Sequence, residues 1–341
     1  MKVVSFGEIL LRLAAPGYTK LFQKDSLDAT FCGSEANVAV SLAILGLDSS
    51  YVSKLPDNDL GHAAVNSMRY FGVDTANVVY GNHRIGLYYL EKGASQRPSK
   101  IIYDRAYSSF SLSERADFDW DKIFNKADWF HWTGINPALG GTLPIICEDA
   151  CKAAKAKGLL ISCDLNYRRN LWSSEDARTV MDRLIPYVDI CIANEEDADK
   201  SLGIKPENNN VDSGELNKPG YEFVARKICS IYGCKKVAIT LRESCSASQN
   251  RWSAILYDGV KQQSYYSKEY NIQIIDRVGA GDSFTAGLIY SLALNKENQA
   301  ALEFATAASC LKHTIEGDYN RTTVSDIENI LKNGGHGRVQ R

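Results

Sequence analysis

Residues 276–290, with the sequence DRVGAGDSFTAGLIY, carry the strongest chemical signal in the chain. Gly279 and Gly281 flank Ala280, and residues this small let a ligand approach the backbone closely. A turn of this kind that leads into a helix presents unpaired N–H groups at the positive end of the helix dipole, which favours an anion such as phosphate. Asp282 follows at once, and its negative charge does not fit simple phosphate binding. As a general base, it would take the proton from a hydroxyl that attacks a phosphoryl group.

A simpler alternative for Asp282 is that it caps a helix after a glycine turn, a position that Asp often fills. The following residues, 284–294, are largely apolar and predict a buried helix. The motif alone leaves both alternatives open, so the rest of the chain bears on which of them applies.

The composition favours a globular enzyme and argues against several other classes of protein. The chain has 341 residues, of which 45% are hydrophobic and 23% charged, values typical of folded α/β proteins. A net charge of −2 gives no reason to expect a nucleic-acid or membrane-surface partner. No apolar run reaches the roughly 18 residues of a membrane-spanning helix, and the first residues, MKVVSFGEILLRL, lack a signal-peptide cleavage pattern.

The cysteines and histidines indicate a reducing compartment and no zinc site. Nine cysteines are an odd number, and none of them forms a CxxC pair. The five histidines are scattered, and no pair has ligand spacing. We therefore expect a cytoplasmic protein with reduced, buried cysteines.

The elements that must position the 276–282 turn alternate along most of the chain. Short apolar runs predict strands, and longer runs with helical spacing, several of them ended by glycine, predict helices. The predicted strands are 3–6, 51–54, 129–132, 159–164, 190–193 and 237–241. The predicted helices are 34–46, 63–71, 143–157, 174–185, 221–232, 284–294, 297–312 and 324–332. This β–α alternation predicts a parallel sheet covered by helices.

Several stretches break this alternation. Residues 85–91 and 101–104 predict the two strands of a hairpin, and 10–32 adds further short strands, which together could form a small sheet over a cleft. Residues 252–275 predict two or three antiparallel strands. The Asn-rich segment 204–220 predicts a mobile surface loop.

Two glycine-containing segments, far apart in the chain, form a pair of signatures. The first is CGSEANVAVSLAILG at 32–46, and the second is DRVGAGDSFTAG at 276–287. They resemble the Gly-Gly…Asn-x-Ala and Asp-Thr-x-Gly-Ala-Gly-Asp patterns of the ribokinase/PfkB family of small-molecule kinases, with Cys32 replacing one glycine and Arg277 replacing the threonine. The resemblance extends over residues 1–332. It implies a ribokinase-like three-layer α/β/α sandwich with a mainly parallel central sheet and a small β-sheet lid.

The resemblance also implies how the chain divides. We expect an α/β kinase core that binds nucleotide and substrate, a small β lid and a loose C-terminal tail. The core would contain residues 1–9, 33–82 and 110–332, the lid residues 10–32 and 83–109, and the tail residues 333–341.

The chemistry implied by the family is phosphoryl transfer from ATP to a sugar hydroxyl. In this resemblance Asp282 is the general base, and the N–H groups of Gly279, Ala280 and Gly281 form the anion hole for the transferring group. Positioning and charge stabilisation would supply most of the catalysis.

Two further motifs resemble the family's nucleotide and metal segments, and each departs from the pattern. TLRESCSAS at 240–248 is similar to the nucleotide-binding segment that starts at Thr240, but Arg242 stands where glycine is usual. NEED at 194–197 is similar to a motif that acts through Mg²⁺ and its water, with Asn194 in place and Asp197 where glutamate is usual. For this second motif, acids that favour a helix N-terminus are the equal alternative.

Several short motifs resemble one subfamily, the kinases of 2-keto-3-deoxygluconate. They are GSEAN (33–37), GLYYLEKG (86–93), YDRAYSS (103–109), DLNYRRNLW (164–172) and KHTIEGDYN (312–320). An open-chain sugar acid needs cations or N–H donors at one end and hydroxyl partners along its length. Arg12 supports an acidic substrate, because family members that take neutral ring sugars usually have an aspartate at this position.

The subfamily resemblance assigns roles to individual residues. The implied substrate contacts are Gly33, Asn37, Tyr88, Tyr103, Arg105, Arg168, Asp282 and Asp318. The implied nucleotide contacts are Asn166, Arg168, Asn194, Thr240, Arg242, Gly279, Ala280, Gly281 and Thr306, with Asp197 holding Mg²⁺ through water. Each has a structural alternative, such as surface ion pairs for the arginines and sheet packing for the tyrosines. Tyr89 adjoins Tyr88, and strand alternation lets only one of them face the cleft.

Other functions remain open from the sequence. A kinase of the same fold for fructose, ribose or a nucleoside is the nearest alternative, followed by a non-catalytic sugar-binding protein. A Rossmann dehydrogenase is weaker, because a single glycine, Gly7, follows the first strand. The family also implies a homo-oligomer through the lid sheet. The sequence leaves the sugar stereochemistry, nucleotide donor and monovalent-cation dependence undetermined.

Overall fold

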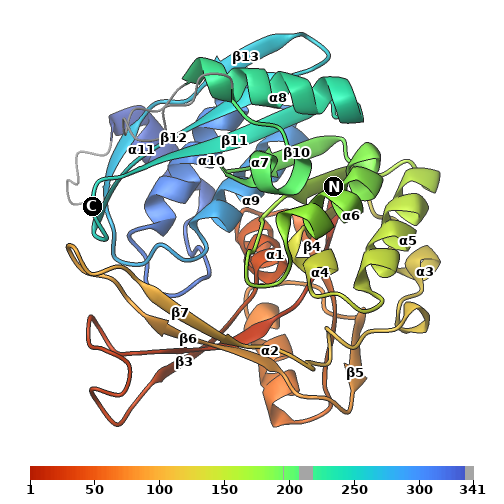
Figure 1. Cartoon of the computed structure of the whole chain (residues 1–341), viewed down its shortest axis with the longest axis vertical. Helices are drawn as coiled ribbons and strands as arrows, with labels where there is room; N and C mark the ends of the chain where they lie inside the picture. The colour runs from red at the N-terminus through yellow and green to blue at the C-terminus, as the bar shows by residue number, and fades with distance from the viewer. Residues whose placement is uncertain (195, 207–217, 335–341) are drawn as a thin grey trace.

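Two β-sheets organise the chain in the computed structural model, which describes residues 1–194, 196–206 and 218–334 (Figure 1). Within these residues the larger sheet has ten strands in the order β13-β12-β11-β10-β9-β8-β1-β4-β5, with β14 paired to β12. Its strands are β1 (Lys2–Phe6), β4 (Asp48–Pro56), β5 (Val78–Gly81), β8 (Trp129–Thr133), β9 (Leu160–Asp164), β10 (Ile190–Ala193), β11 (Lys236–Ser244), β12 (Gln249–Asp258), β13 (Gln263–Tyr266) and β14 (Tyr270–Gln273).

The larger sheet is parallel from β5 to β11 and antiparallel at its other edge. β1 pairs in parallel with both β4 and β8, and the same direction continues through β9, β10 and β11. β12 then pairs antiparallel with β11, β13 and β14. This confirms the mainly parallel sheet and the antiparallel strands expected in 252–275.

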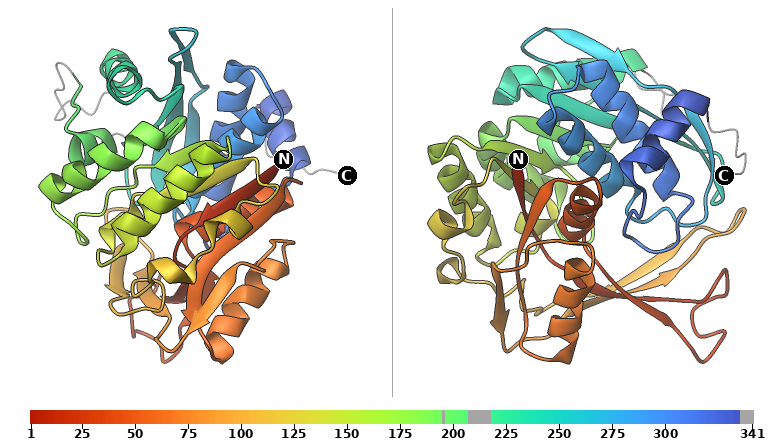
Figure 2. Two further views of the ribbon diagram at one scale, coloured as in Figure 1. Left: turned by 90° about the vertical axis from the view of Figure 1, so that its right-hand side faces the viewer. Right: turned by 180° about the vertical axis from the view of Figure 1, so that it is seen from behind.

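Helices cover both faces of this sheet (Figure 2). They are α1 (Ser34–Ile44), α2 (Asp59–Arg69), α3 (Trp120–Ile123), α4 (Ile135–Ala138), α5 (Leu143–Ala156), α6 (Ser174–Leu184), α7 (Asp197–Leu202), α8 (Lys218–Tyr232), α9 (Ala280–Ala293), α10 (Asn298–Lys312) and α11 (Val324–Asn333). Neighbouring residues of β1 point to opposite faces. Val3 therefore packs in the cluster with α1, α9 and α10, and Val4 in the cluster with α5, α6 and α8. The three-layer sandwich expected from the sequence is thus confirmed.

The smaller sheet has the strand order β3-β2-β6-β7 and lies at the bottom of Figure 1. Its strands are β2 (Leu10–Ala14), β3 (Asp28–Cys32), β6 (Gly86–Glu91) and β7 (Lys100–Asp104). β6 and β7 form the expected antiparallel hairpin. Residues 10–32 contain the expected short strands, β2 and β3, but residues 15–27 between them form no strand. Residues 16–23 instead form turns closed by Thr19 N–H to the Pro16 carbonyl and Gln23 N–H to the Lys20 carbonyl.

Some boundaries also differ from the expected ones. α9 begins at Ala280 rather than near residue 284, because Gly279 adopts φ 82° and the small residues after it complete the first helical turn. Asp282 therefore lies inside the helix. The sequence did not predict β5, α3 or α4, and it predicted the helix start at 194–197, where α7 begins at Asp197, only as an alternative. Most of the predicted loop 204–220, and the tail from residue 335, lie outside the described residues.

Two negative findings apply to the described residues. None of their helices is both long and apolar enough to cross a membrane. All nine cysteines are free, and only Cys245 is exposed.

Candidate active site

A cavity of about 400 Å³ lies where the parallel strands end, between the larger sheet, the smaller sheet and the start of α9. The smaller sheet, β3-β2-β6-β7, is called the lid from here on. Open α/β sheets bind ligands at the carboxyl ends of their strands, where the connecting loops can diverge. Residues that follow β1, β9 and β10 line the cavity, together with Thr240 and Arg242 within β11 and lid residues from β6 and β7. Segments far apart in the sequence therefore contribute to one site.

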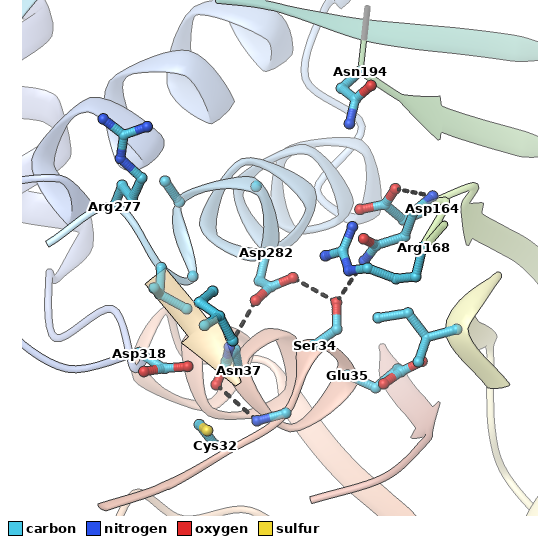
Figure 3. Close-up of a pocket in the computed structure, with 18 of the residues that line it drawn as sticks. Cys32, Ser34, Glu35, Asn37, Asp164, Arg168, Asn194, Arg277, Asp282 and Asp318 are labelled. Carbon is cyan, nitrogen blue, oxygen red and sulfur yellow. Dashed lines mark hydrogen bonds between the residues drawn. The ribbon is translucent and has the colours of Figure 1, made fainter. Parts of the chain in front are cut away.

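Asp282 lies at the centre of this cavity and has both carboxylate oxygens fixed (Figure 3). Ser34 Oγ donates to Oδ1 at 2.6 Å, and Asn37 Nδ2 donates to Oδ2 at 2.6 Å. Burial raises the pKa of Asp282 to about 6, against the lowering effect of the two hydrogen bonds. A carboxylate with this pKa accepts a proton readily near neutral pH.

The donors to Asp282 come from the first turn of α1 and are held in turn by neighbours. Asn37 Oδ1 accepts from the Gly33 N–H at 3.4 Å, and Ser34 Oγ accepts from Asn166 Nδ2 at 3.1 Å. Asn166 has φ 41°, a left-handed conformation that asparagine tolerates better than most residues. The sequence reasoning overlooked Ser34. Its place beside Gly33, at a helix start in the first signature, was the available signal.

The turn before Asp282 has the geometry of an anion site. Gly279 has φ 82°, and a Cβ there would lie 2.1 Å from the Asp318 carbonyl oxygen, so only glycine fits. A Cβ on Gly281 would meet nothing within 4 Å, and this residue faces the cavity. The N–H groups of the first turn of α9 lack helical acceptors, although that of Ala280 lies 3.4 Å from the Arg277 carbonyl.

The lid side of the cavity is lined by Tyr88, Tyr103 and Arg105. Tyr88 is buried and donates to Asp318 Oδ2 at 2.7 Å, whereas Tyr89 is not among the lining residues. Tyr103 is 39% exposed. Among the predicted substrate residues, the structure thus brings these tyrosines together with Asp318.

Arg105 is already paired inside the protein. Its Nε donates to Glu8 Oε2 at 2.8 Å and a terminal nitrogen contacts the same oxygen, while Ser108 Oγ donates to Glu8 Oε1. The arginine is 8% exposed and the glutamate 3%. Arg105 therefore lines the cavity as half of a buried ion pair, and no local pattern in the sequence singled out Glu8 as its partner.

Arg12 is buried and is not among the residues that line the cavity. Its guanidinium bonds to Asp276 Oδ2 at 2.6 Å and to Asp318 Oδ1. Together with Tyr88, it holds both oxygens of the Asp318 carboxylate. Arg12 thus orients an acid that does line the cavity.

Three arginines also line the cavity, Arg168, Arg242 and Arg277, together with Asn194 and Thr240, and this part of the lining is called the cationic end below. Burial and the charge of Arg242 lower the pKa of Arg277. Like charges kept close together favour binding of an anion. The two family departures, at 242 and 277, therefore lie in the same part of the site.

Thr306 is not brought to the cavity. It is fully buried, and its hydroxyl donates to the Leu302 carbonyl at 2.8 Å in its own helix. The Thr306 side chain is therefore not among the residues that line the cavity, and its predicted contact with a nucleotide stays a prediction.

Two acids lie beside Arg168, the buried Asp197 and the partly buried Asp164. Asp197 accepts the N–H groups of Tyr167 and Asn194, each at 3.0 Å, and Asp164 accepts that of Asn166 at 3.1 Å. Burial raises the pKa of both acids, and the charge of Asp197 raises that of Asp164 further. The sequence reasoning named Asp197 but overlooked Asp164, which ends a strand at the cavity.

These acids fit a hydrated cation better than a protein-enclosed one. The described residues contain no group of three His, Cys, Asp or Glu side chains that could hold a metal. Mg²⁺ usually keeps several waters and takes one or two carboxylates plus substrate phosphates. Asp164 and Asp197, two carboxylates that line the same cavity, match that requirement.

Comparison with known proteins finds relatives along almost the whole chain. Residues 1–323 match the family model described as pfkB family carbohydrate kinase. The crystal structure of 2-dehydro-3-deoxygluconokinase from Thermotoga maritima is 51% identical, covers 97% of this chain and 98% of that one, and gives a TM-score of 0.93. A 2-dehydro-3-deoxygalactonokinase from Haloferax volcanii is 29% identical and covers 98% of both chains. A 2-dehydro-3-deoxygluconokinase from Thermoproteus tenax is 27% identical and covers 97% of this chain and 94% of its own.

Proposed function

The chain belongs to the pfkB family of carbohydrate kinases, which are ATP-using transferases, and from this premise we propose that it transfers the γ-phosphoryl group of ATP to the 6-hydroxyl of 2-keto-3-deoxygluconate. The family expected from the two signatures is confirmed by the match over residues 1–323. The substrate is supported by the names of the relatives from Thermotoga maritima and Thermoproteus tenax, which use the synonym 2-dehydro-3-deoxygluconate.

The geometry of Asp282 is the observation that carries the proposed mechanism. Ser34 and Asn37 fix its two oxygens at 2.6 Å, which aims the carboxylate without neutralising it. The sugar hydroxyl lies against Asp282, which takes the proton as the oxygen attacks phosphorus. The first turn of α9 supplies N–H groups to the transferring phosphoryl group as its charge shifts.

The cationic end is proposed to bind the phosphates of ATP. Arg168, Arg242 and Arg277 line that end, and guanidinium groups bind phosphate oxygens in bidentate fashion. Asp164 and Asp197 would hold a hydrated Mg²⁺ beside them. When bound, that ion would neutralise charge on the ATP phosphates.

The carboxylate of the sugar acid is proposed to bind near the lid. Arg12 replaces the aspartate expected in kinases of neutral ring sugars, and its pairing with Asp276 and Asp318 offsets part of the negative charge of these two acids at that wall. Arg105 is paired with Glu8, so it supports the lid rather than standing free for the substrate. Tyr88 and Tyr103 offer flat walls with hydroxyl groups.

A coupled ADP-release assay with Mg-ATP tests this proposal. The panel contains 2-keto-3-deoxygluconate, its galacto epimer 2-keto-3-deoxygalactonate, gluconate, fructose and ribose. We expect the highest kcat/KM with a 2-keto-3-deoxy sugar acid. The epimer arm matters, because the relative from Haloferax volcanii bears the galacto name. Preference for fructose or ribose would discard the acidic substrate, and release of no ADP with any sugar would discard the reaction itself.

Two further proposals concern the whole protein. Nine free cysteines support a reducing compartment such as the cytoplasm. The outer face of the lid supports a homo-oligomer, because an apolar row of paired residues crosses all four strands there: Ala29, Leu13, Tyr89 and Ile102.

A further inference from the structure

Lys312 has one of the most deeply buried side chains in the protein, and it lies next to the anion-site turn. It ends α10 and is 0% exposed. Its Nζ lies 3.0 Å from the Ile315 carbonyl oxygen and 3.4 Å from the Asp276 carbonyl oxygen. A buried lysine is costly unless its charge is compensated, so these contacts require an explanation.

The two carbonyl groups belong to the two loops that build the site. Asp276 begins the turn that leads to Asp282, and Ile315 lies in the loop that leads to Asp318. Other contacts join the same loops: the Asp276 N–H bonds to the His313 carbonyl at 3.1 Å, and the Gly317 N–H bonds to Asp276 Oδ2 at 3.2 Å. The Lys312 ammonium thus occupies the junction between them.

The charges around this junction balance. Two buried acids, Asp276 and Asp318, face two buried cations, Arg12 and Lys312. Burial lowers the pKa of Lys312, and Asp276, Asp318 and Asp282 act in the opposite direction. The lysine therefore supplies a positive charge that the two acids and the two carbonyl dipoles require.

We propose that the Lys312 ammonium is a tethered monovalent cation that holds the 276–282 turn in its phosphoryl-binding conformation, so that the enzyme turns over without an added monovalent cation. Backbone carbonyl groups that converge on one point are ligands for K⁺ or NH₄⁺, and an ammonium on a lysine stem fills the same place permanently. Lys312 acts through the turn and is a positioning residue. The inference rests on the role proposed above for the turn but not on the identity of the sugar.

The first test uses the wild-type enzyme with whichever sugar of the panel gives ADP release. Turnover is measured with Mg-ATP in buffers whose only monovalent cation is tetramethylammonium, which is too large for such a site, and then with added NH₄⁺, K⁺ or Na⁺. We expect rates that agree within about twofold, since a filled site leaves no room for an ion. A strong rise in kcat with K⁺ or NH₄⁺ would overturn the proposal whatever the variants do.

The second test replaces Lys312 with methionine, which keeps most of the stem and removes the ammonium. In tetramethylammonium we expect kcat to fall by roughly 10–100-fold, the scale of a slightly misplaced reacting group. The KM for sugar should change little. NH₄⁺ or K⁺ should restore part of kcat by filling the vacated place, a gain that a purely structural lysine would not give.

Lys236→Met is the matched control. Lys236 is a partly buried lysine paired with Asp258 and Asn298, and it does not line the cavity. Its loss should lower thermal stability without creating a cation dependence. A folded Lys312→Met enzyme with wild-type turnover, or with lost turnover that no cation restores, would overturn the proposal. If Lys312→Met does not fold, Lys312→Gln is measured in its place, and the wild-type arm still decides.

Discussion

Asp282 shows how an acid can be fixed by donors and still act as a base. Its two oxygens accept hydrogen bonds from Ser34 and Asn37, which lower its pKa. Burial raises the pKa by more than these bonds lower it, so the result is about 6. Each carboxylate oxygen has a second lone pair available for a substrate proton. The residue is therefore oriented by its neighbours and tuned by its surroundings, and these two effects can be separated by experiment.

Asp282→Asn should leave sugar binding nearly unchanged and lower kcat by about 10²–10⁴-fold, the usual contribution of a general base. The amide keeps the shape and one acceptor oxygen, which can still accept from Asn37, but its NH₂ group replaces the other acceptor and it cannot take the proton. The measurement is single-turnover phosphoryl transfer together with the sugar Kd from calorimetry. Turnover within tenfold of wild type would remove Asp282 from the role of base.

The pH profile should report the same carboxylate. The base works only when deprotonated, so kcat/KM should fall as pH drops through about 6.

The stability of the protein should depend on the same carboxylate. The folded-state pKa of Asp282 lies above the ordinary value of 3.8, so Asp282 favours folding at low pH and loses that contribution as pH rises from about 4 to 6. Asp282→Asn should therefore be more stable than wild type at pH 8, by on the order of 1–3 kcal/mol since one pKa unit is about 1.4 kcal/mol. Urea denaturation of both proteins at pH 4 and pH 8 checks this. A difference in free energy of unfolding between Asp282→Asn and wild type that does not grow with pH would contradict it.

At the scale of elements, the backbone conformation at the start of α9 requires glycine at position 279 but not at position 281. Gly279→Ala should cost at least about 1–3 kcal/mol, because φ 82° is strained for alanine and its Cβ would overlap the Asp318 carbonyl. Gly281→Ala should leave stability unchanged or slightly higher, because its Cβ meets open space in a helical turn. That methyl group faces the cavity, so turnover should still fall.

Thermal melts and kcat for the two alanine variants make this comparison. A Gly279→Ala protein as stable as wild type would show that the turn can adapt. A fully active Gly281→Ala enzyme would mean that the transferring phosphoryl group does not bind at the first turn of α9.

The lid strand β7 is attached to the core by a buried ion pair just beyond its end. Arg105 and Glu8 are 9% and 2% exposed in their side chains, whereas Arg84 and Asp104, a second pair at the same strand, are 40% and 48% exposed. Arg105→Ala should cost about 3–5 kcal/mol, because it strands a buried carboxylate. Arg84→Ala should cost under about 1 kcal/mol, because solvent screens that pair.

Chemical denaturation of both variants tests the attachment. Adding Glu8→Gln to Arg105→Ala should recover part of the loss, since no unpaired charge then remains buried. Equally small losses in the free energy of unfolding for Arg105→Ala and Arg84→Ala would contradict this prediction and mean that another group compensates the charge of Glu8.

Over the whole molecule, the sequence predicted what local pattern and motif encode. The alternating strands and helices, the β6–β7 hairpin and the Asp282 turn follow from periodicity, glycine placement and signature residues. Pairings between distant segments did not follow. Glu8 meets Arg105, and Arg12 meets Asp276, across roughly 100 and 260 residues of chain, and such contacts depend on how the sheets pack rather than on any local pattern. For the same reason, Arg105 could be predicted as a substrate contact, with a surface ion pair as the alternative, but its buried pairing with Glu8 could not.

The lid also bears on how copies of the protein associate. Leu13, Tyr89 and Ile102 are adjacent across β2, β6 and β7, and none of the three is buried. Paired residues on one face of a sheet form a continuous surface, and an apolar one at a strand edge favours burial against a second sheet. We expect the protein to elute as a dimer or larger assembly and Tyr89→Glu to shift it toward monomer in light-scattering measurements. Val260→Glu, at an apolar residue 77% exposed far along the chain from the lid, is the control and should change nothing. A monomeric wild type, or equal effects of both variants, would mean that the lid face meets solvent and serves only to close the cavity.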